Sequence, residues 1–152
     1  MYSILLFLHS IIRWLVFISL IYAVYRAFTG YKQQRLFSRK DNAVRHWTAT
    51  IAHIQLIIGI LLYVKSPVIG YFWHNKAEAI SDLQVSFFAL IHLLLMLAAI
   101  ICITIGSAMA KRRAADQLKF RTMLYWFVFA LVLIFIAVPW PFSPLVARPY
   151  LR

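Results

Sequence analysis

The chain has few charged residues and only one cysteine. Of its 152 residues, 13% are charged and 64% are hydrophobic, whereas a soluble domain is roughly half apolar. This composition excludes an ordinary soluble protein and predicts an integral membrane protein. The single cysteine, Cys102, excludes an intramolecular disulfide, and the lack of a CxxCH motif excludes covalent attachment of a c-type haem. Cys102 lies in an apolar run, where we expect a small buried residue.

Acidic residues are scarce as well. Four acidic residues stand against 16 basic ones, so the formal net charge is +12. Such an excess in a soluble protein would indicate nucleic-acid binding, but here most basic residues lie between apolar runs, where membrane topology explains them. No nucleic-acid partner is therefore expected. GxSxG and HExxH motifs and paired carboxylates are also missing, which leaves oxidoreduction as the only enzymatic class to consider.

Long apolar runs account for most of the chain. Their lengths approach or exceed the roughly 20 residues that cross a bilayer, and they predict one all-α membrane domain, an up-down-up-down four-helix bundle. The expected spans are 3–28, 43–64, 82–110 and 122–138. The first run has no preceding basic segment and no A-x-A site, which predicts a retained helix rather than a signal peptide. We expect the tail, Ser143–Arg152, to be irregular.

Residues with strong local preferences predict the ends of these helices. Gly30 is expected near the end of the first helix, and Asp41 or Asn42 is expected to be the N-cap of the second. Pro67 should stop the second helix. The aromatic-rich segment that follows it is expected to lie at the membrane interface and to include a short helix.

Basic residues are unevenly spread over the connecting segments. Six lie in or beside 29–44 and five lie in 111–121, whereas the remaining connection and the tail contain four together. The positive-inside rule then predicts that 29–44 and 111–121 are cytoplasmic. Both termini of this multi-pass protein would lie outside.

Histidines interrupt the apolar runs at positions that suggest a site. Imidazole inside a bilayer is costly and usually marks function. At about 1.5 Å per residue, His92 is expected roughly 15 Å and His53 roughly 16 Å from the outer surface, and His9 roughly 9 Å. His53 and His92 lie on consecutive antiparallel helices. Their matching depth predicts a metal site, and two axial nitrogens from facing helices favour one b-type haem.

Arg13 is the clearest further candidate for this site. It follows His9 by four residues, so the two share a helical face, and no acidic residue is expected at its depth. We expect Arg13 to hold a haem propionate, with Gln55 as another candidate donor. His9 could also replace either axial ligand, or form a quinone pocket with Arg13.

Other roles for the histidines stay open. A zinc site made by His9, His53 and His92 would lack a fourth ligand, whereas copper could use histidine with Met96. The polar residues could also line a transport or proton pathway. In a fourth alternative the protein is a non-redox subunit of a larger complex, with the histidines as interhelical polar contacts.

Four motifs carry a family resemblance: LHSIIRW (Leu8–Trp14), AHIQLIIGILLY (Ala52–Tyr63), HLLLMLAAIICITIG (His92–Gly106) and VPWPF (Val138–Phe142). They resemble small bacterial four-helix membrane proteins labelled cytochrome b and, more distantly, cytochrome b561 and other haem-b membrane subunits. The resemblance covers nearly the whole chain. It implies haem b, electron transfer with a quinone or with a partner redox protein or complex subunit, and location in the bacterial inner membrane.

The resemblance also carries specific residues. His9, His53 and His92 match the family pattern, which does not fix the two that ligate. The chain departs from the b561 plan because it lacks the histidine pairs for two stacked haems. One haem is therefore the expected number.

Overall fold

A computed structural model shows an all-α protein and describes residues 1–140. No strand occurs in this part of the chain. The helical elements, in chain order, are α1 (Tyr2–Lys32), α2 (Arg39–Lys65), α3 (Pro67–His74), α4 (Lys76–Ala79), α5 (Leu83–Ser86), the π-helix η1 (Phe87–Ile91), α6 (His92–Arg112) and α7 (Asp116–Ala137). The tail expected to be irregular, Ser143–Arg152, lies outside the described residues.

Four of the helical segments are long and apolar enough to cross a membrane. They are α1, α2, the continuous segment Leu83–Arg112 and α7, and they confirm the four-helix prediction. Gly30 lies two residues before the end of the first helix, as expected. Two expected starts were wrong. The second helix begins at Arg39, four residues before the expected start. The last helix begins at Asp116, six residues before the expected start.

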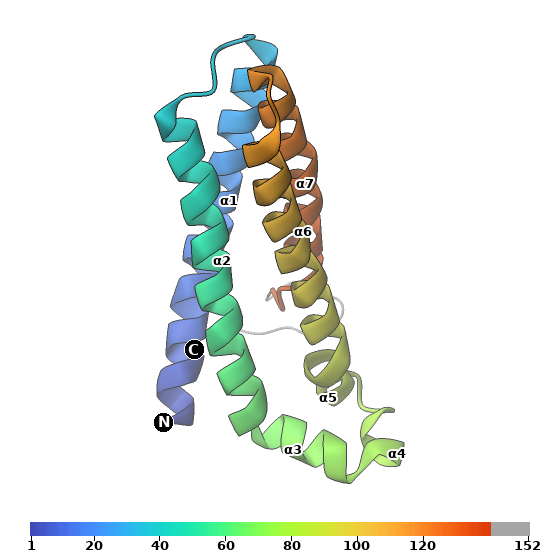
Figure 1. Ribbon diagram of the computed structural model, residues 1–152. Helices are drawn as coiled ribbons and strands as arrows, with labels where there is room; N and C mark the ends of the chain where they lie inside the picture. Colours follow the sequence, from blue (N-terminus) through green and yellow to red (C-terminus); the bar gives the residue numbers. More distant parts are fainter. Residues whose placement is uncertain (141–152) are drawn as a thin grey trace.

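The four long helices alternate in direction and form a closed ring (Figure 1). α1 packs against α2 and α7, and α6 packs against α7 and α2, so α1 and α6 stand diagonally across the bundle. The loops 33–38 and 113–115 meet at the end drawn uppermost in Figure 1, which we call the basic end. The N-terminus and α3 mark the opposite, N-terminal end.

Small residues dominate the core in the half of the bundle nearer the basic end. Seven alanines from all four long helices are buried there: Ala23, Ala27, Ala49, Ala52, Ala99, Ala110 and Ala130. Small side chains allow membrane helices to approach closely and to pack by van der Waals contact. At Gly106 of α6 even a single methyl group would overlap Trp126 of α7. This half of the bundle is therefore tightly packed.

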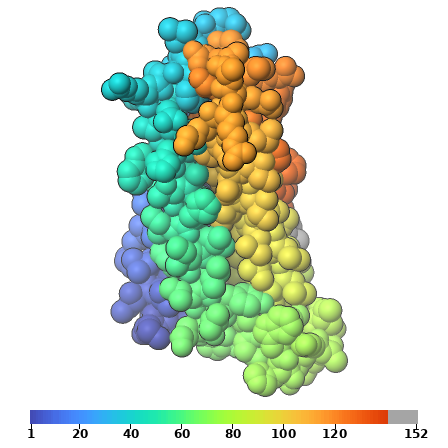
Figure 2. Space-filling model, in the orientation of Figure 1, coloured from blue at the N-terminus to red at the C-terminus, as the bar shows by residue number. Residues whose placement is uncertain are grey.

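A short helix closes the N-terminal end. Pro67 stops α2 as expected and becomes the first residue of α3, a position that suits proline because its missing N–H needs no partner there. Ile69 and Phe72 of α3 are buried with Ala89. In the space-filling view, α3 and α4 project at the foot of α2 and of the segment leading to α6 (Figure 2). This arrangement confirms the short helix predicted after the second span.

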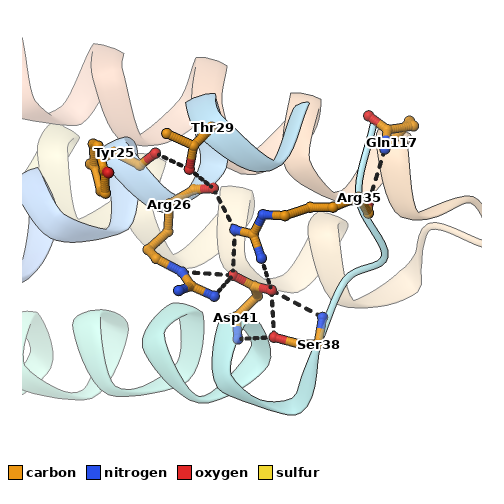
Figure 3. A network of polar contacts seen from close by, with 7 residues as sticks. All are labelled: Tyr25, Arg26, Thr29, Arg35, Ser38, Asp41 and Gln117. Carbon is orange, nitrogen blue, oxygen red and sulfur yellow. Dashed lines mark hydrogen bonds and ion pairs between the residues drawn. The ribbon is translucent and has the colours of Figure 1, made fainter. Parts of the chain in front are cut away.

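A buried carboxylate ties the α1–α2 connection together (Figure 3). Asp41 accepts hydrogen bonds from Arg26 at 2.7 Å, from Arg35 at 3.1 Å and from the Ser38 hydroxyl at 2.6 Å, and its side chain is fully buried. The N-cap of α2 is Ser38 rather than Asp41 or Asn42. Ser38 and Asp41 instead form a capping box, in which each side chain accepts from the other's backbone N–H.

A second polar contact lies just below this network. The buried guanidinium of Arg45 donates to the Ser107 carbonyl at 3.0 Å and to the Ser107 hydroxyl. Its remaining nitrogens donate to Asn42, at 2.9 and 3.2 Å. At the basic end, Asp41 is thus ion-paired and Arg45 is hydrogen-bonded to neutral groups within the chain, which offsets the cost of burying these charges.

Candidate cofactor site

Two imidazoles face each other across the bundle in its N-terminal half. His9 of α1 and His92 at the start of α6 have ring centroids 6.4 Å apart and ring planes at 65°. Both side chains are half-buried. Because α1 and α6 are diagonal in the ring of helices, the two rings meet over the interior of the bundle.

His92 is held by groups from two other elements. Its Nδ1 lies 2.8 Å from the carbonyl oxygen of Ala137, the last residue of α7. A carbonyl only accepts, so Nδ1 carries the proton and the Nε2 of the neutral ring keeps its lone pair. Phe87 and Phe88 stand 6.0 and 6.1 Å from the ring, between centroids. This is the arrangement that typically orients a metal-binding histidine.

A π-helical turn directly precedes His92. Such turns are rare and often occur at functional sites, since the extra residue redirects the side chains that follow. The Tyr63 hydroxyl of α2 donates to the Ala89 carbonyl within this turn at 3.1 Å, and Trp73 of α3 donates to the Tyr63 oxygen at 3.2 Å. Hydrogen bonds therefore connect the N-terminal end of the bundle to the segment that orients His92.

His9 has a different environment from His92. Its Nδ1 is buried and has no hydrogen-bond partner within residues 1–140. Gln55 of α2 donates to the His9 backbone carbonyl at 3.0 Å, and the Oε1 of Gln55 is likewise buried without a partner in that part of the chain. A methyl group at Gly59 would stand 3.3 Å from His9 Cε1. Gly59 thus allows α2 to pass close to the imidazole.

Arg13 lies one turn beyond His9 on α1, half-buried. Its guanidinium carbon is 5.8 Å from the centroid of the Trp14 ring. Trp14 in turn packs edge-on against Trp140, with centroids 5.8 Å apart. Arg13 is thus on the same helix and near the same depth as His9, and its predicted contact with a propionate stays a prediction.

His53 occupies another level of the bundle. Its Nε2 is 3.0 Å from the Thr104 hydroxyl, and that hydroxyl donates to the Ile100 carbonyl at 2.7 Å. The hydroxyl proton is already engaged, so His53 Nε2 is the donor of this contact. Thr104 follows His92 by twelve residues, which is about 18 Å of helix at 1.5 Å per residue. The structure does not bring His53 and His92 together.

The expected equal depth of these two histidines was therefore wrong. It assumed that the second and third spans end level with each other at the outer surface. Instead, Tyr63 near the end of α2 contacts Ala89. The residues that precede Ala89, from the start of α5 at Leu83, therefore extend beyond the last turn of α2. That offset brings the middle of α2 opposite the second half of α6.

The remaining histidines lie away from this pair. His46 is exposed beside Trp47, with ring centroids 5.8 Å apart, and the exposed His74 bonds the Gly70 carbonyl of its own helix at 2.7 Å. Within residues 1–140, no three His, Cys, Asp or Glu side chains gather as a metal site would require. A zinc site of His9, His53 and His92 is thus not assembled.

One contributor to the site was missing from the sequence analysis. The last span lacks histidine, yet the carbonyl of its Ala137 orients His92. Backbone groups carry no residue-type signal. The only hint is position, since carbonyls in the last turn of a helix have no partner within it.

Comparisons with protein-family models, with curated proteins and with solved structures found no match to this chain.

Proposed function

We propose that the protein is a haem-b-binding membrane electron-transfer protein in which His9 and His92 would hold the haem. The observation that carries this proposal is the pair of imidazoles facing each other from α1 and α6, with centroids 6.4 Å apart. Metal–imidazole bonds are about 2.0–2.1 Å long, so two rings on opposite sides of one metal have centroids about 6 Å apart. The observed spacing fits such a pair.

The surroundings of both rings also fit a haem. His92 has an unprotonated Nε2, and its other nitrogen is fixed by Ala137. His9 has a buried nitrogen without a partner in the described part of the chain. Phe87 and Phe88 supply aromatic surface beside His92. A haem b bound there would supply one-electron redox chemistry, tuned by its axial ligands and their hydrogen bonds.

The chain's own residues would then have distinct tasks. His9 and His92 would hold the haem, and Ala137 and the π-turn would keep the imidazole of His92 in orientation. Arg13, one turn from His9 on the same helix, would provide the positive charge for a propionate, because a guanidinium group donates paired hydrogen bonds to a carboxylate. This pairing replaces His53 of the sequence-based prediction with His9, because His53 donates its Nε2 proton to Thr104.

We place the protein in the bacterial inner membrane with both termini outside. Loops 33–38 and 113–115 lie at the same end of the bundle, together with basic residues of their flanks, and short basic connections usually stay in the cytoplasm. The His9–His92 pair would then lie toward the outer leaflet. A membrane quinol and a partner redox protein or complex subunit would be the sources and acceptors of electrons.

A second function is favoured by a different observation. Three interhelical hydrogen bonds involve these polar residues: His53 to Thr104, Gln55 to His9 and His92 to Ala137. Such contacts contribute about 0.6 kcal/mol each on average in membrane proteins. In a non-redox subunit of a larger complex, they would simply hold the helices together.

The deciding experiment is a reduced-minus-oxidised absorption spectrum of the detergent-purified protein and of three matched variants. We expect a b-type band in the wild type, its loss in His9→Ala and in His92→Ala, and its retention in His53→Ala. Loss in His53→Ala with retention in His9→Ala would restore the sequence-based pair. A colourless wild type that also fails to bind added haem would favour the non-redox subunit.

A further inference from the structure

We propose that a groove between α6 and α7 at the basic end binds the headgroup of one anionic phospholipid. This inference does not depend on haem binding. The groove has a volume of about 310 Å³. Its lining combines cationic, hydroxyl and aromatic side chains, chiefly Arg113, Arg121, Thr122, Met109, Tyr125 and Trp126.

The polar part of the groove is built for a phosphate. The Nε of Arg113 donates to the Thr122 hydroxyl at 3.3 Å, which links the two helices. The guanidinium of Arg121 lies 5.6 Å from the centroid of the Tyr125 ring. No carboxylate is among the described residues that line the groove. Two guanidinium groups without an acidic partner in their groove match a phosphate diester, which accepts paired N–H donors.

The apolar part continues from this point along the helices toward the membrane. Tyr125 and Trp126 follow Arg121 and Thr122 by one helical turn, about 6 Å at 1.5 Å per residue. Met109 of α6 faces them across the groove. Tyrosine and tryptophan favour the level of the headgroups. The groove therefore passes from cationic to apolar over the depth at which a phospholipid passes from phosphate to acyl chain.

This gradient distinguishes a lipid from a soluble phosphate. Tyr125 is 64% exposed and Trp126 is half-buried, and both lie on the membrane side of Arg121 in a helix apolar enough to cross a membrane. A soluble phosphate would use only the arginines, whereas a phospholipid would also cover these side chains. Basic pockets between membrane helices recognise anionic lipid headgroups in this way.

The test uses native mass spectrometry of the purified full chain with phosphatidylglycerol or phosphatidylcholine. Four proteins are compared: wild type, the double variant Arg113→Gln/Arg121→Gln, the single variant Arg121→Gln, and the control Lys40→Gln/Arg112→Gln. The control removes the same charge from exposed positions that do not line the groove. Circular dichroism verifies that each variant keeps its helical content.

We expect the wild type to retain one phosphatidylglycerol in preference to phosphatidylcholine. A basic residue that contacts the bound anionic headgroup contributes about fivefold in affinity, so the double variant should lose about thirtyfold and Arg121→Gln about fivefold. Lys40 and Arg112 do not line the groove, so the control should stay within about twofold of the wild type. Equal binding of both lipids by the wild type, or an equal loss in the control, would overturn the proposal. Displacement of the lipid by equimolar glycerol phosphate would overturn the lipid assignment in favour of a soluble phosphate.

Discussion

The two ends of the bundle treat their buried polar groups differently. At the basic end, Asp41 accepts from Arg26, Arg35 and Ser38, and Arg45 is paired with Ser107. At the N-terminal end, buried atoms of His9 and Gln55 have no partner within residues 1–140. Unpaired polar groups at membrane depth are costly. The basic end also has one such atom, the Oε1 of Gln117, but its buried charged groups, Asp41 and Arg45, are hydrogen-bonded within the chain. The basic end therefore serves as a scaffold, and the N-terminal end, with two such atoms, is where binding of an additional group would be most favourable.

The packing follows the same division. Most of the fully buried side chains of the central core belong to the half nearer the basic end, for example Leu20, Ile103 and Met123. Around the two facing histidines, interior positions such as His9, Gln55 and Met96 are only half-buried. A binding site is often less tightly packed than the scaffold that supports it, because binding regions belong to the less stable parts of a fold.

The largest expected effect comes from breaking the scaffold network. Asp41→Ala leaves Arg26 and Arg35 without their shared carboxylate and should lower the free energy of unfolding by about 3 kcal/mol, since removal of one partner of a buried ion pair is strongly destabilising. Unfolding by sodium dodecyl sulfate in mixed micelles measures this loss. Asp116→Ala is the control. It removes a partly exposed (i,i+3) pair with Lys119 and should cost about 0.5 kcal/mol. Equal losses would show that the network is not the anchor of this end.

The next effect compares two glycines. Gly106→Ala forces a methyl group into Trp126 and should destabilise the bundle by about 2 kcal/mol, as overpacking does. Gly59→Ala brings a methyl group to 3.3 Å from His9, a tight contact that a shift of the imidazole by a few tenths of an ångström relieves, so the loss of stability in the same micelle assay should be smaller. If haem is bound, its absorption spectrum should shift in Gly59→Ala and not in Gly106→Ala. The reverse pattern would contradict the division between scaffold and site.

A smaller effect is expected at the hydrogen bond that supports the π-turn. Tyr63→Phe removes the hydroxyl that donates to Ala89 and should cost about 1 kcal/mol, the usual contribution of one such bond. The same variant should alter the midpoint potential of a haem held by His92. Tyr25→Phe, at an exposed position on α1, serves as the control and should leave both quantities unchanged. An unaltered potential in Tyr63→Phe would remove the π-turn from the site.

The smallest effect concerns His53. His53→Leu removes its contact with Thr104 and should cost about 0.6 kcal/mol, the average for an interhelical hydrogen bond in a membrane. His46→Leu, at an exposed position, is the matched control in the same unfolding assay. A loss of several kcal/mol, or loss of a haem band, would mean that His53 belongs to the site.

Composition and apolar run length predicted the four helices well, because the bilayer requires a minimum length and satisfied backbone groups. Helix ends were harder to predict. Ser38, not Asp41, is the N-cap of α2, and Asp41 is the third helical residue, whose side chain completes the capping box. Both residue types suit an N-cap, so preference alone does not decide between them.

The candidate site was predicted only in part. The sequence singled out His9, His92 and Arg13 because polar groups stand out in apolar runs. The sequence-based prediction paired His92 with His53 because it assumed that the second and third spans end at the same level of the outer surface. The offset between α2 and the π-turn segment, visible in the Tyr63–Ala89 contact, depends on tertiary packing. The contribution of Ala137 comes from its backbone carbonyl, which cannot be predicted from residue types.

The hydrogen bond between His92 and Ala137 also bears on the order of assembly. His9 of α1 leaves the ribosome well before Ala137, the last residue of α7. The imidazole pair therefore acquires its final orientation only after all four helices have entered the membrane and packed. A cofactor held by this pair would therefore bind to the folded bundle and not to the growing chain. The fraction of protein that contains the cofactor would then measure how much of it has folded completely.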